Sequence, residues 1–239
     1  MNSVEFRTGV IKPVEVYKEA WAMIKDQYWL VFAVVLVGML IGGAIPIVLI
    51  GPMICGIFLV LLNKYEGRPV DFGDLFKGFD YFLPSLILAI LITVPIIIMV
   101  VGMYVPMIAM AMTGPRMSEN ELMGFIAGVF AVELVFAVIM VCLHTLLMFS
   151  FPLLVDKKLS VIESVKLSAR AVWKNMKGVV GLFLVGFVVM FIGYLALCVG
   201  IYLTLPLVFA AQAVAYRKVF PAAPTGNFQP PPPTVYQGL

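Results

Sequence analysis

Four long apolar runs without any lysine or arginine limit what this chain can fold into. They are Trp29–Leu62, Phe82–Met112, Leu122–Val155 and Gly178–Val214. A single helix needs about 20 apolar residues to cross a hydrocarbon core of about 30 Å. The first and last runs, with 34 and 37 residues, are long enough for two crossings each. We therefore expect an all-α polytopic transmembrane bundle of six spans, with tight helical hairpins at both ends of the chain.

Helix-breaking residues near the middle of the two longest runs favour these hairpins. The first run contains Gly42, Gly43, Pro46, Gly51 and Pro52, and the last contains Gly200 and Pro206. We expect Pro52 and Pro206 to open the two return spans, because proline is tolerated in the first turn of a helix but disfavoured in its interior.

The composition excludes an ordinary soluble domain. Hydrophobic residues make up 63% of the 239 residues and charged residues only 12%, whereas soluble domains have about 45–50% and about 25%. One membrane domain, residues 1–220, accounts for most of the chain and leaves no room for a separate catalytic domain. Residues 221–239 contain six prolines and no charged side chain. A disordered polyproline-type tail is favoured there over a ligand for an aromatic groove.

The basic residues are distributed unevenly around the expected spans. Fifteen of the 16 lysines and arginines fall before the first span, between the second and third, between the fourth and fifth, or after the sixth. Only Arg116 falls between the third and fourth spans. Cytoplasmic loops of membrane proteins carry such an excess of basic residues. Both termini are therefore expected in the cytoplasm.

An amphipathic segment precedes each expected pair of spans on the cytoplasmic side. Apolar residues recur at helical spacing in all three: Tyr17, Ala20, Trp21, Ile24 and Tyr28; Phe72, Leu75, Phe76 and Phe79; and Ile162, Val165, Ala169, Val172 and Met176. Asp71 stands at a helix N-cap position, and Ser160 with Glu163 forms a capping box. Such helices lie flat at the headgroup level, so the membrane domain is expected to comprise three units, each an interfacial helix followed by a helical hairpin.

Glu133 and His144 are the only carboxylate and the only imidazole within the spans. Eleven residues at 100° each place them about 20° apart around one helix, with Glu133 close to the bilayer midplane. A proton or cation relay along this stripe is one hypothesis. The favoured one is a neutral Glu133, hydrogen-bonded to Thr93, Tyr194, Tyr202, Thr204 or Gln212, that joins helices, with His144 tucked at the interface. Ligation of a haem or chlorophyll metal by His144 has the least support.

No sequence motif indicates an enzyme, a metal site or a bound cofactor. The sequence contains no HExxH, GxSxG or Walker A motif, and no GxGxxG motif followed by an acidic residue. Cys55, Cys142 and Cys198 lack CxxC spacing and lie inside apolar runs, so they are expected to be small buried hydrophobes. We predict a non-catalytic protein that needs no cofactor and binds no nucleic acid.

A basic cluster lies just cytoplasmic of the fourth and fifth spans. It consists of Lys157, Lys158, Lys166, Arg170, Lys174 and Lys177. Each cation near an anionic leaflet contributes about 1 kcal/mol to membrane attachment. Anionic lipid headgroups are therefore the expected partners, as a general anchor or, alternatively, through recognition of one headgroup.

Three short segments carry a resemblance to a known family. The first segment is Gly51-Pro52 with Gly56, and the second is Asp74-Leu75-Phe76-Lys77-Gly78-Phe79. The third is Phe151-Pro152-Leu153-Leu154-Val155-Asp156, which precedes a helix that carries Ser160, Ser164 and Ser168. Over roughly residues 10–220 this resembles uncharacterised bacterial six-span proteins related to the membrane domain of glycerophosphodiester phosphodiesterases. The resemblance implies a bacterial inner membrane location and carries over no catalytic residue.

Two functional hypotheses follow. The first is a non-catalytic subunit, scaffold or lipid-interacting accessory of a membrane complex, with a protein partner as well as lipid. The second is a small transporter, channel or lipid-translocating protein that uses Glu133 as its coupling site and proline-broken helices as moving parts.

Overall fold

The computed structural model describes residues 5–113, 118–196 and 199–222. Arg116, Cys198 and all but the first two residues of the predicted tail lie outside this part of the chain. Helices and connecting turns make up the described residues, which include no strand. In order, the elements are α1 (Pro13–Ile24), η1 (Lys25–Gln27), α2 (Tyr28–Ala44), α3 (Pro46–Tyr65), η2 (Phe72–Tyr81), α4 (Phe82–Thr113), α5 (Glu119–Leu147), α6 (Ser150–Asp156), α7 (Val161–Lys174), α8 (Met176–Leu195) and α9 (Val199–Val219).

Five helical stretches within the described residues are long and apolar enough to cross a membrane. They are Pro13–Ala44, Pro46–Tyr65, Phe72–Met112, Glu119–Asp156 and Met176–Leu195. The expected sixth span, α9, is not among them. Its 21 residues include Gln212, Arg217 and Lys218 toward the C-terminal end, and these polar side chains lower its hydropathy.

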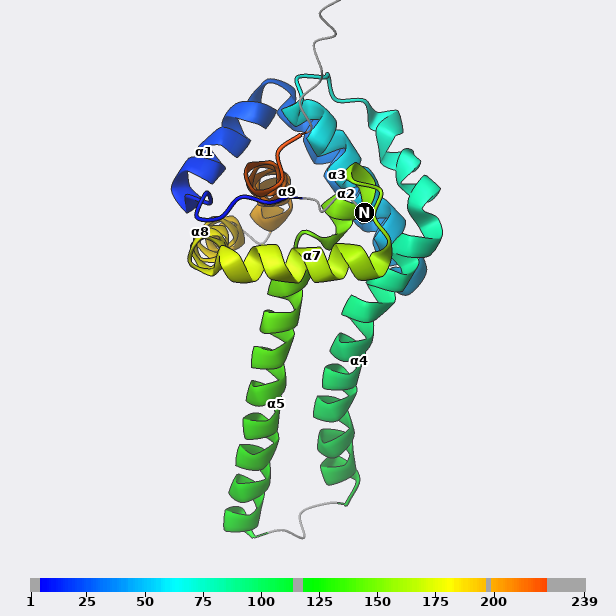
Figure 1. The fold of residues 1–239 in the computed structure, drawn as a ribbon. Coiled ribbons are helices and arrows are strands. Elements are labelled where there is room, and N and C mark those ends of the chain that lie inside the picture. Colours follow the sequence, from blue (N-terminus) through cyan, green and yellow to red (C-terminus); the bar gives the residue numbers. More distant parts are fainter. Residues whose placement is uncertain (1–4, 114–117, 197–198, 223–239) are drawn as a thin grey trace, which may run out of the picture.

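The molecule consists of a helical head, formed by α1–α3, η1, η2 and α6–α9, from which α4 and α5 project as a long hairpin (Figure 1). With 32 and 29 residues, these two helices are about 48 Å and about 44 Å long. Both exceed a hydrocarbon core of about 30 Å. Most side chains along them are apolar and exposed, including Leu134 at 68% and Phe130 at 73%. The hairpin thus presents an apolar surface that the described residues do not cover.

The helix pairs do not run parallel to one another. In the view of Figure 1, α8 and α9 are seen end-on, whereas α4 and α5 run down the page. The hydrophobic core lies in the head, where α3 is central and contacts α2, η2, α4, α6 and α9. The hairpin joins this core only at its base.

Both long runs divide into two helices, but not at the expected prolines. The first turns at Ile45, and Pro46 is the first residue of α3, a position where a missing N–H costs nothing. Pro52 and Pro206 instead lie inside α3 and α9, so the prediction that they open the return helices is wrong.

A further break divides the third apolar run. There α5 ends at Leu147 and α6 begins at Ser150. In α4, by contrast, the helix continues through Pro95 and Pro106.

The three expected interfacial segments are helical, although the faces that they bury differ in part from the sequence pattern. In α1 the side chains of Tyr17, Ala20 and Ile24 are buried, whereas Trp21 is 48% exposed. The second segment is the 3-10 helix η2, whose N-cap Asp71 accepts a hydrogen bond from the Gly73 N–H. In α7 the buried residues are Ser164, Ser168, Ala171 and Val172, and Ile162 is 66% exposed. Three of these four buried side chains are small, which lets α7 approach its neighbours closely.

Glycine allows a close backbone contact between α3 and η2. A Cβ atom added at Gly56 would lie 1.9 Å from the Leu75 carbonyl oxygen, and one at Gly78 would lie 2.0 Å from the Pro52 carbonyl oxygen. No side chain fits at either position. This contact fixes η2, and with it the start of α4, against α3.

Candidate functional site

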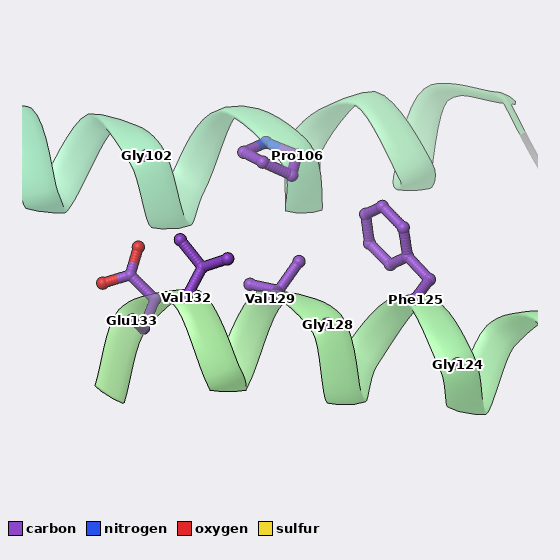
Figure 2. Close-up of a pocket in the computed structure, with 8 residues that line it drawn as sticks. All are labelled: Gly102, Pro106, Gly124, Phe125, Gly128, Val129, Val132 and Glu133. Atoms are coloured by element: carbon purple, nitrogen blue, oxygen red, sulfur yellow. The ribbon is translucent and has the colours of Figure 1, made fainter. Parts of the chain in front are cut away.

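Glu133 lies in an apolar groove between α4 and α5. The groove has a volume of about 420 Å³ and is lined by Gly102, Pro106, Gly124, Phe125, Gly128, Val129, Val132 and Glu133. Figure 2 shows the Glu133 carboxyl group pointing toward α4 at Gly102. One carboxyl oxygen lies 3.5 Å from the position that a Cβ atom on Gly102 would take. The carboxyl group thus lies within van der Waals distance of the α4 backbone at Gly102.

Pro106 changes the hydrogen-bonding capacity of this groove. Proline has no N–H, so the Gly102 carbonyl cannot receive the usual helical hydrogen bond from residue 106. Glu133 contacts the same turn of α4, where a protonated carboxyl group is a suitable donor for a carbonyl oxygen. No cation lines the groove, so Glu133 has no ion-pair partner there.

None of the partners expected for Glu133 contacts it among the described residues. The Thr204 hydroxyl donates to the Ile201 carbonyl oxygen at 2.9 Å, and the Gln212 amide donates to the Met148 carbonyl oxygen at 2.6 Å. Both of these side chains belong to the head, whereas Glu133 lies on the projecting hairpin (Figure 1).

His144 lies in a different groove from Glu133. The two residues are separated by about 16 Å along α5. The groove at His144 has a volume of about 670 Å³ and lies where α5 meets α1, α8 and α9 in the head. Its lining includes Tyr17, Thr145, Gly186 and Gln212 but not Glu133. The structure therefore does not bring together the two residues of the hypothetical relay.

One hydrogen bond determines which ring nitrogen of His144 can act as an acceptor. Nδ1 lies 2.8 Å from the Met140 carbonyl oxygen. A carbonyl oxygen only accepts, so Nδ1 carries the hydrogen. In the neutral ring Nε2 then has a free lone pair.

The predicted basic cluster divides into one paired residue and five exposed ones. Lys157 lies 3.2 Å from Asp156 and donates to the Pro221 carbonyl oxygen. The other five are exposed and form no ion pair with a described residue: Lys158, Lys166, Arg170, Lys174 and Lys177. The five exposed cations are available to a ligand outside the chain, and Lys157 is not.

Two of these cations border a groove that the sequence pattern did not predict. It has a volume of about 400 Å³ and is lined by Phe6, Leu146, Ala169, Arg170, Trp173 and Lys174. Trp173 is 69% exposed. An apolar floor with two cations and an exposed indole at its rim matches the boundary between lipid chains and headgroups.

The capping box predicted at the start of α7 is present. The Ser160 hydroxyl and backbone N–H both donate to Glu163 Oε2, at 2.8 and 3.2 Å, and the Glu163 N–H donates to Ser160 Oγ at 3.3 Å. These hydrogen bonds hold the pKa of the Glu163 carboxyl below its ordinary range. The box fixes the N-terminal end of the helix that carries Lys166, Arg170 and Lys174.

A buried ionic cluster that the sequence did not reveal joins α3, α6 and α9. Arg217, whose side chain is 3% exposed, lies 2.8 Å from Asp156 and 2.5 Å from Glu66. The Tyr216 hydroxyl donates to the other Asp156 carboxylate oxygen at 2.6 Å. Glu66, Asp156 and Arg217 lie far apart in the sequence, so no local sequence pattern indicates that they form an ionic cluster.

The two described cysteines differ in environment. Cys55 is buried in α3, whereas Cys142 is exposed on α5, so the prediction of a buried thiol is wrong at position 142. Cys142 lies on the outer surface of the hairpin, where the neighbouring Val141 is also exposed. Among the described residues, no group of three or more histidine, cysteine or acidic side chains could hold a metal ion.

Comparison with known protein families, with curated proteins and with solved structures finds no match to this chain. The family resemblance of the three sequence segments therefore stays a prediction. The arguments for function rest on the grooves and surfaces of the molecule itself.

Proposed function

We propose that the protein is a non-catalytic integral membrane protein that acts as a lipid-interacting subunit, scaffold or accessory of a membrane complex. The observation that carries this proposal is the groove beside Arg170 and Lys174, in which two unpaired cations border an apolar floor. An anionic lipid would place its headgroup at these cations and its chain against Phe6 and Leu146.

The length of the α4–α5 hairpin supports a protein partner. Its two helices are longer than a hydrocarbon core is thick, and their exposed side chains are predominantly apolar. Apolar surface that extends beyond the lipid requires another cover. In this proposal the membrane is a bacterial inner membrane, the chain crosses it six times, and both termini are cytoplasmic.

The lipid contact is tested by thermal unfolding of the purified protein in mild detergent. We expect added phosphatidylglycerol, but not phosphatidylcholine, to raise the midpoint of the wild type. The double variant Arg170→Glu/Lys174→Glu should lose this difference. Lys18→Glu/Lys25→Glu makes the same change in net charge on exposed residues of another element and should retain it. Equal losses in both variants would contradict a defined site and indicate general electrostatic attraction.

The complex is tested by crosslinking in native membranes followed by purification in mild detergent. A partner crosslinked to the α4–α5 hairpin is the expected result. A strictly monomeric protein without partners would count against a subunit or scaffold role.

Transport remains the alternative, because Glu133 is the one ionisable side chain in the groove between α4 and α5. Ion flux into proteoliposomes, compared between the wild type and Glu133→Gln, tests this function. A flux that depends on the carboxyl group would favour transport. Absent flux, or equal flux in both proteins, would eliminate it.

A further inference from the structure

The groove at His144 contains polar atoms without partners at the edge of an apolar surface. Tyr17 is 8% exposed, and its hydroxyl forms no hydrogen bond with any described residue. Val180, Phe183, Leu184 and Phe187 supply apolar lining and are exposed on their outer side. Tyr17 lines the groove, and its hydroxyl oxygen is not among the fully buried atoms that lack a partner. The hydroxyl group is therefore accessible from the groove and available to a ligand atom.

Gly186 gives the Tyr17 hydroxyl its position. A Cβ atom on Gly186 would lie 2.7 Å from the Tyr17 oxygen. The hydroxyl group therefore lies directly against the backbone of α8, in a space that any other residue would fill.

The polar groups of the groove differ in what they offer a ligand. The Tyr17 hydroxyl is a donor. His144 Nε2 is an acceptor in the neutral ring, because Nδ1 donates to the Met140 carbonyl oxygen. The side-chain N–H₂ of Gln212 donates to the Met148 carbonyl oxygen, which leaves the side-chain oxygen of Gln212 as an acceptor. No lysine, arginine, aspartate or glutamate lines the groove.

From this arrangement we propose that the groove binds an uncharged lipid through a hydroxyl headgroup, as in a long-chain alcohol or a diacylglycerol. The lipid hydroxyl accepts a hydrogen bond from Tyr17 and donates one to His144 or Gln212. Its chain lies against the apolar side chains of α8. An anionic headgroup finds no cation here, and a carbonyl headgroup leaves the two acceptors unused. This inference rests on the proposed lipid-interacting function but concerns a separate groove from the one at Arg170.

Photolabelling of the full-length protein in mild detergent tests the site. The probe is hexadecanol with a diazirine near its hydroxyl end, and the labelled fraction is measured by mass spectrometry. We expect unlabelled hexadecanol and diacylglycerol to compete, and palmitate to compete poorly. Tyr17→Phe and His144→Leu should each weaken binding about fivefold, the loss of one net hydrogen bond. Gly186→Ala, which displaces the Tyr17 hydroxyl, should also weaken it.

Two controls keep the test specific. Tyr194→Phe removes a hydroxyl from an exposed position on α8 and should bind like the wild type. Arg170→Glu/Lys174→Glu should also bind like the wild type, so that failure of the anionic-lipid site and failure of this site are distinguishable. Because Tyr17→Phe keeps the packed ring, its thermal midpoint should be close to that of the wild type.

Three results would overturn the proposal. Labelling that is unchanged in both Tyr17→Phe and His144→Leu would remove the polar contacts on which it depends. Competition by palmitate as strong as by hexadecanol would contradict an uncharged ligand. Stronger competition by a long-chain quinone than by the alcohol would assign the groove to a carbonyl ligand instead.

Discussion

Ser164 and Ser168 are both fully buried on α7, one turn apart, yet only one of them has partners for its hydroxyl group. The Ser168 hydroxyl donates to the Leu146 carbonyl oxygen at 2.7 Å and accepts from the Phe149 N–H at 3.1 Å. These two backbone groups flank the break between α5 and α6. Among the described residues, the Ser164 hydroxyl has no partner. Ser168 therefore replaces helical hydrogen bonds that the break removes.

We predict that Ser168→Ala destabilises the protein by about 1–3 kcal/mol, because two buried backbone groups lose their partner. Ser164→Ala is the matched control and should be neutral or slightly stabilising, since it removes an unpaired polar group. Thermal unfolding in detergent measures both. Equal effects of the two substitutions would contradict this role for Ser168.

Arg217 illustrates a different cost of burying polar groups. It pairs with Asp156 and Glu66, which Lys157 and Arg68 also contact, but its Nε and Nη1 atoms have no hydrogen-bond partner among the described residues. Removing Arg217 takes away the buried cation between the two carboxylates and leaves each with a single cation that is more exposed, Lys157 or Arg68. The neighbouring Lys218 instead forms an exposed pair with Glu19 at 2.8 Å.

Arg217→Leu should lower the free energy of unfolding by about 3–5 kcal/mol. Lys218→Leu, one residue further, should cost no more than about 1 kcal/mol because exposed pairs contribute little. The difference between the two thermal midpoints is the measurement. Comparable midpoints would show that Arg217 is not a structural centre of the head.

At the scale of the element, local signals worked where both partners lie within one helical turn. Ser160 and Glu163 predicted the start of α7, and Asp71 predicted the N-cap of η2. The division of α5 from α6 could not be predicted, because the side chain that satisfies the break comes from α7. The buried face of α7 was predicted only in part: Val172 is buried as expected, but Ser164, Ser168 and Ala171 were not identified. The small residues of α7 pack closely against neighbouring helices, and a search for regularly spaced apolar residues does not detect buried serines.

The start of α7 should depend on pH through Glu163. Its folded pKa is lowered by the hydrogen bonds from Ser160, so the ionised form stabilises the helix above the unfolded pKa, about 4.3. This contribution should be lost as the pH falls through the lower folded value. The protection factors for hydrogen exchange of the first amides of α7, which are corrected for the intrinsic pH dependence of exchange, should therefore fall in acid. Glu163→Gln should remove this pH dependence, and an unchanged profile would exclude Glu163 as its source.

At the scale of the whole molecule, the apolar runs correctly indicated a helical protein with helices long enough to cross a membrane. They did not indicate the separate head and hairpin. That division depends on contacts between distant elements, such as α1 with α9 and α3 with η2. The distinct grooves of Glu133 and His144 likewise depend on which helices face α5, and a helical wheel contains no such information.

Single cysteines in a cysteine-free background test the proposed crossings. In a six-span protein with cytoplasmic termini, Ile45→Cys, Ser118→Cys and Leu195→Cys should all react with an impermeant maleimide added to intact cells. Lys158→Cys, in the turn between α6 and α7, should react only after permeabilisation. Reaction at Ser118→Cys alone would leave α4 and α5 as the crossing pair and would contradict six spans.

The backbone contact of Gly56 and Gly78 has a mechanical consequence. Two main chains that touch without intervening side chains cannot slide along one another by a helical turn, because the side chains next to each glycine would collide. A second such contact, between Gly51 and the Ser85 carbonyl oxygen, fastens the first turn of α4 as well. Any rotation of the α4–α5 hairpin relative to α3 must therefore occur beyond Ser85, because the first turn of α4 is held against α3.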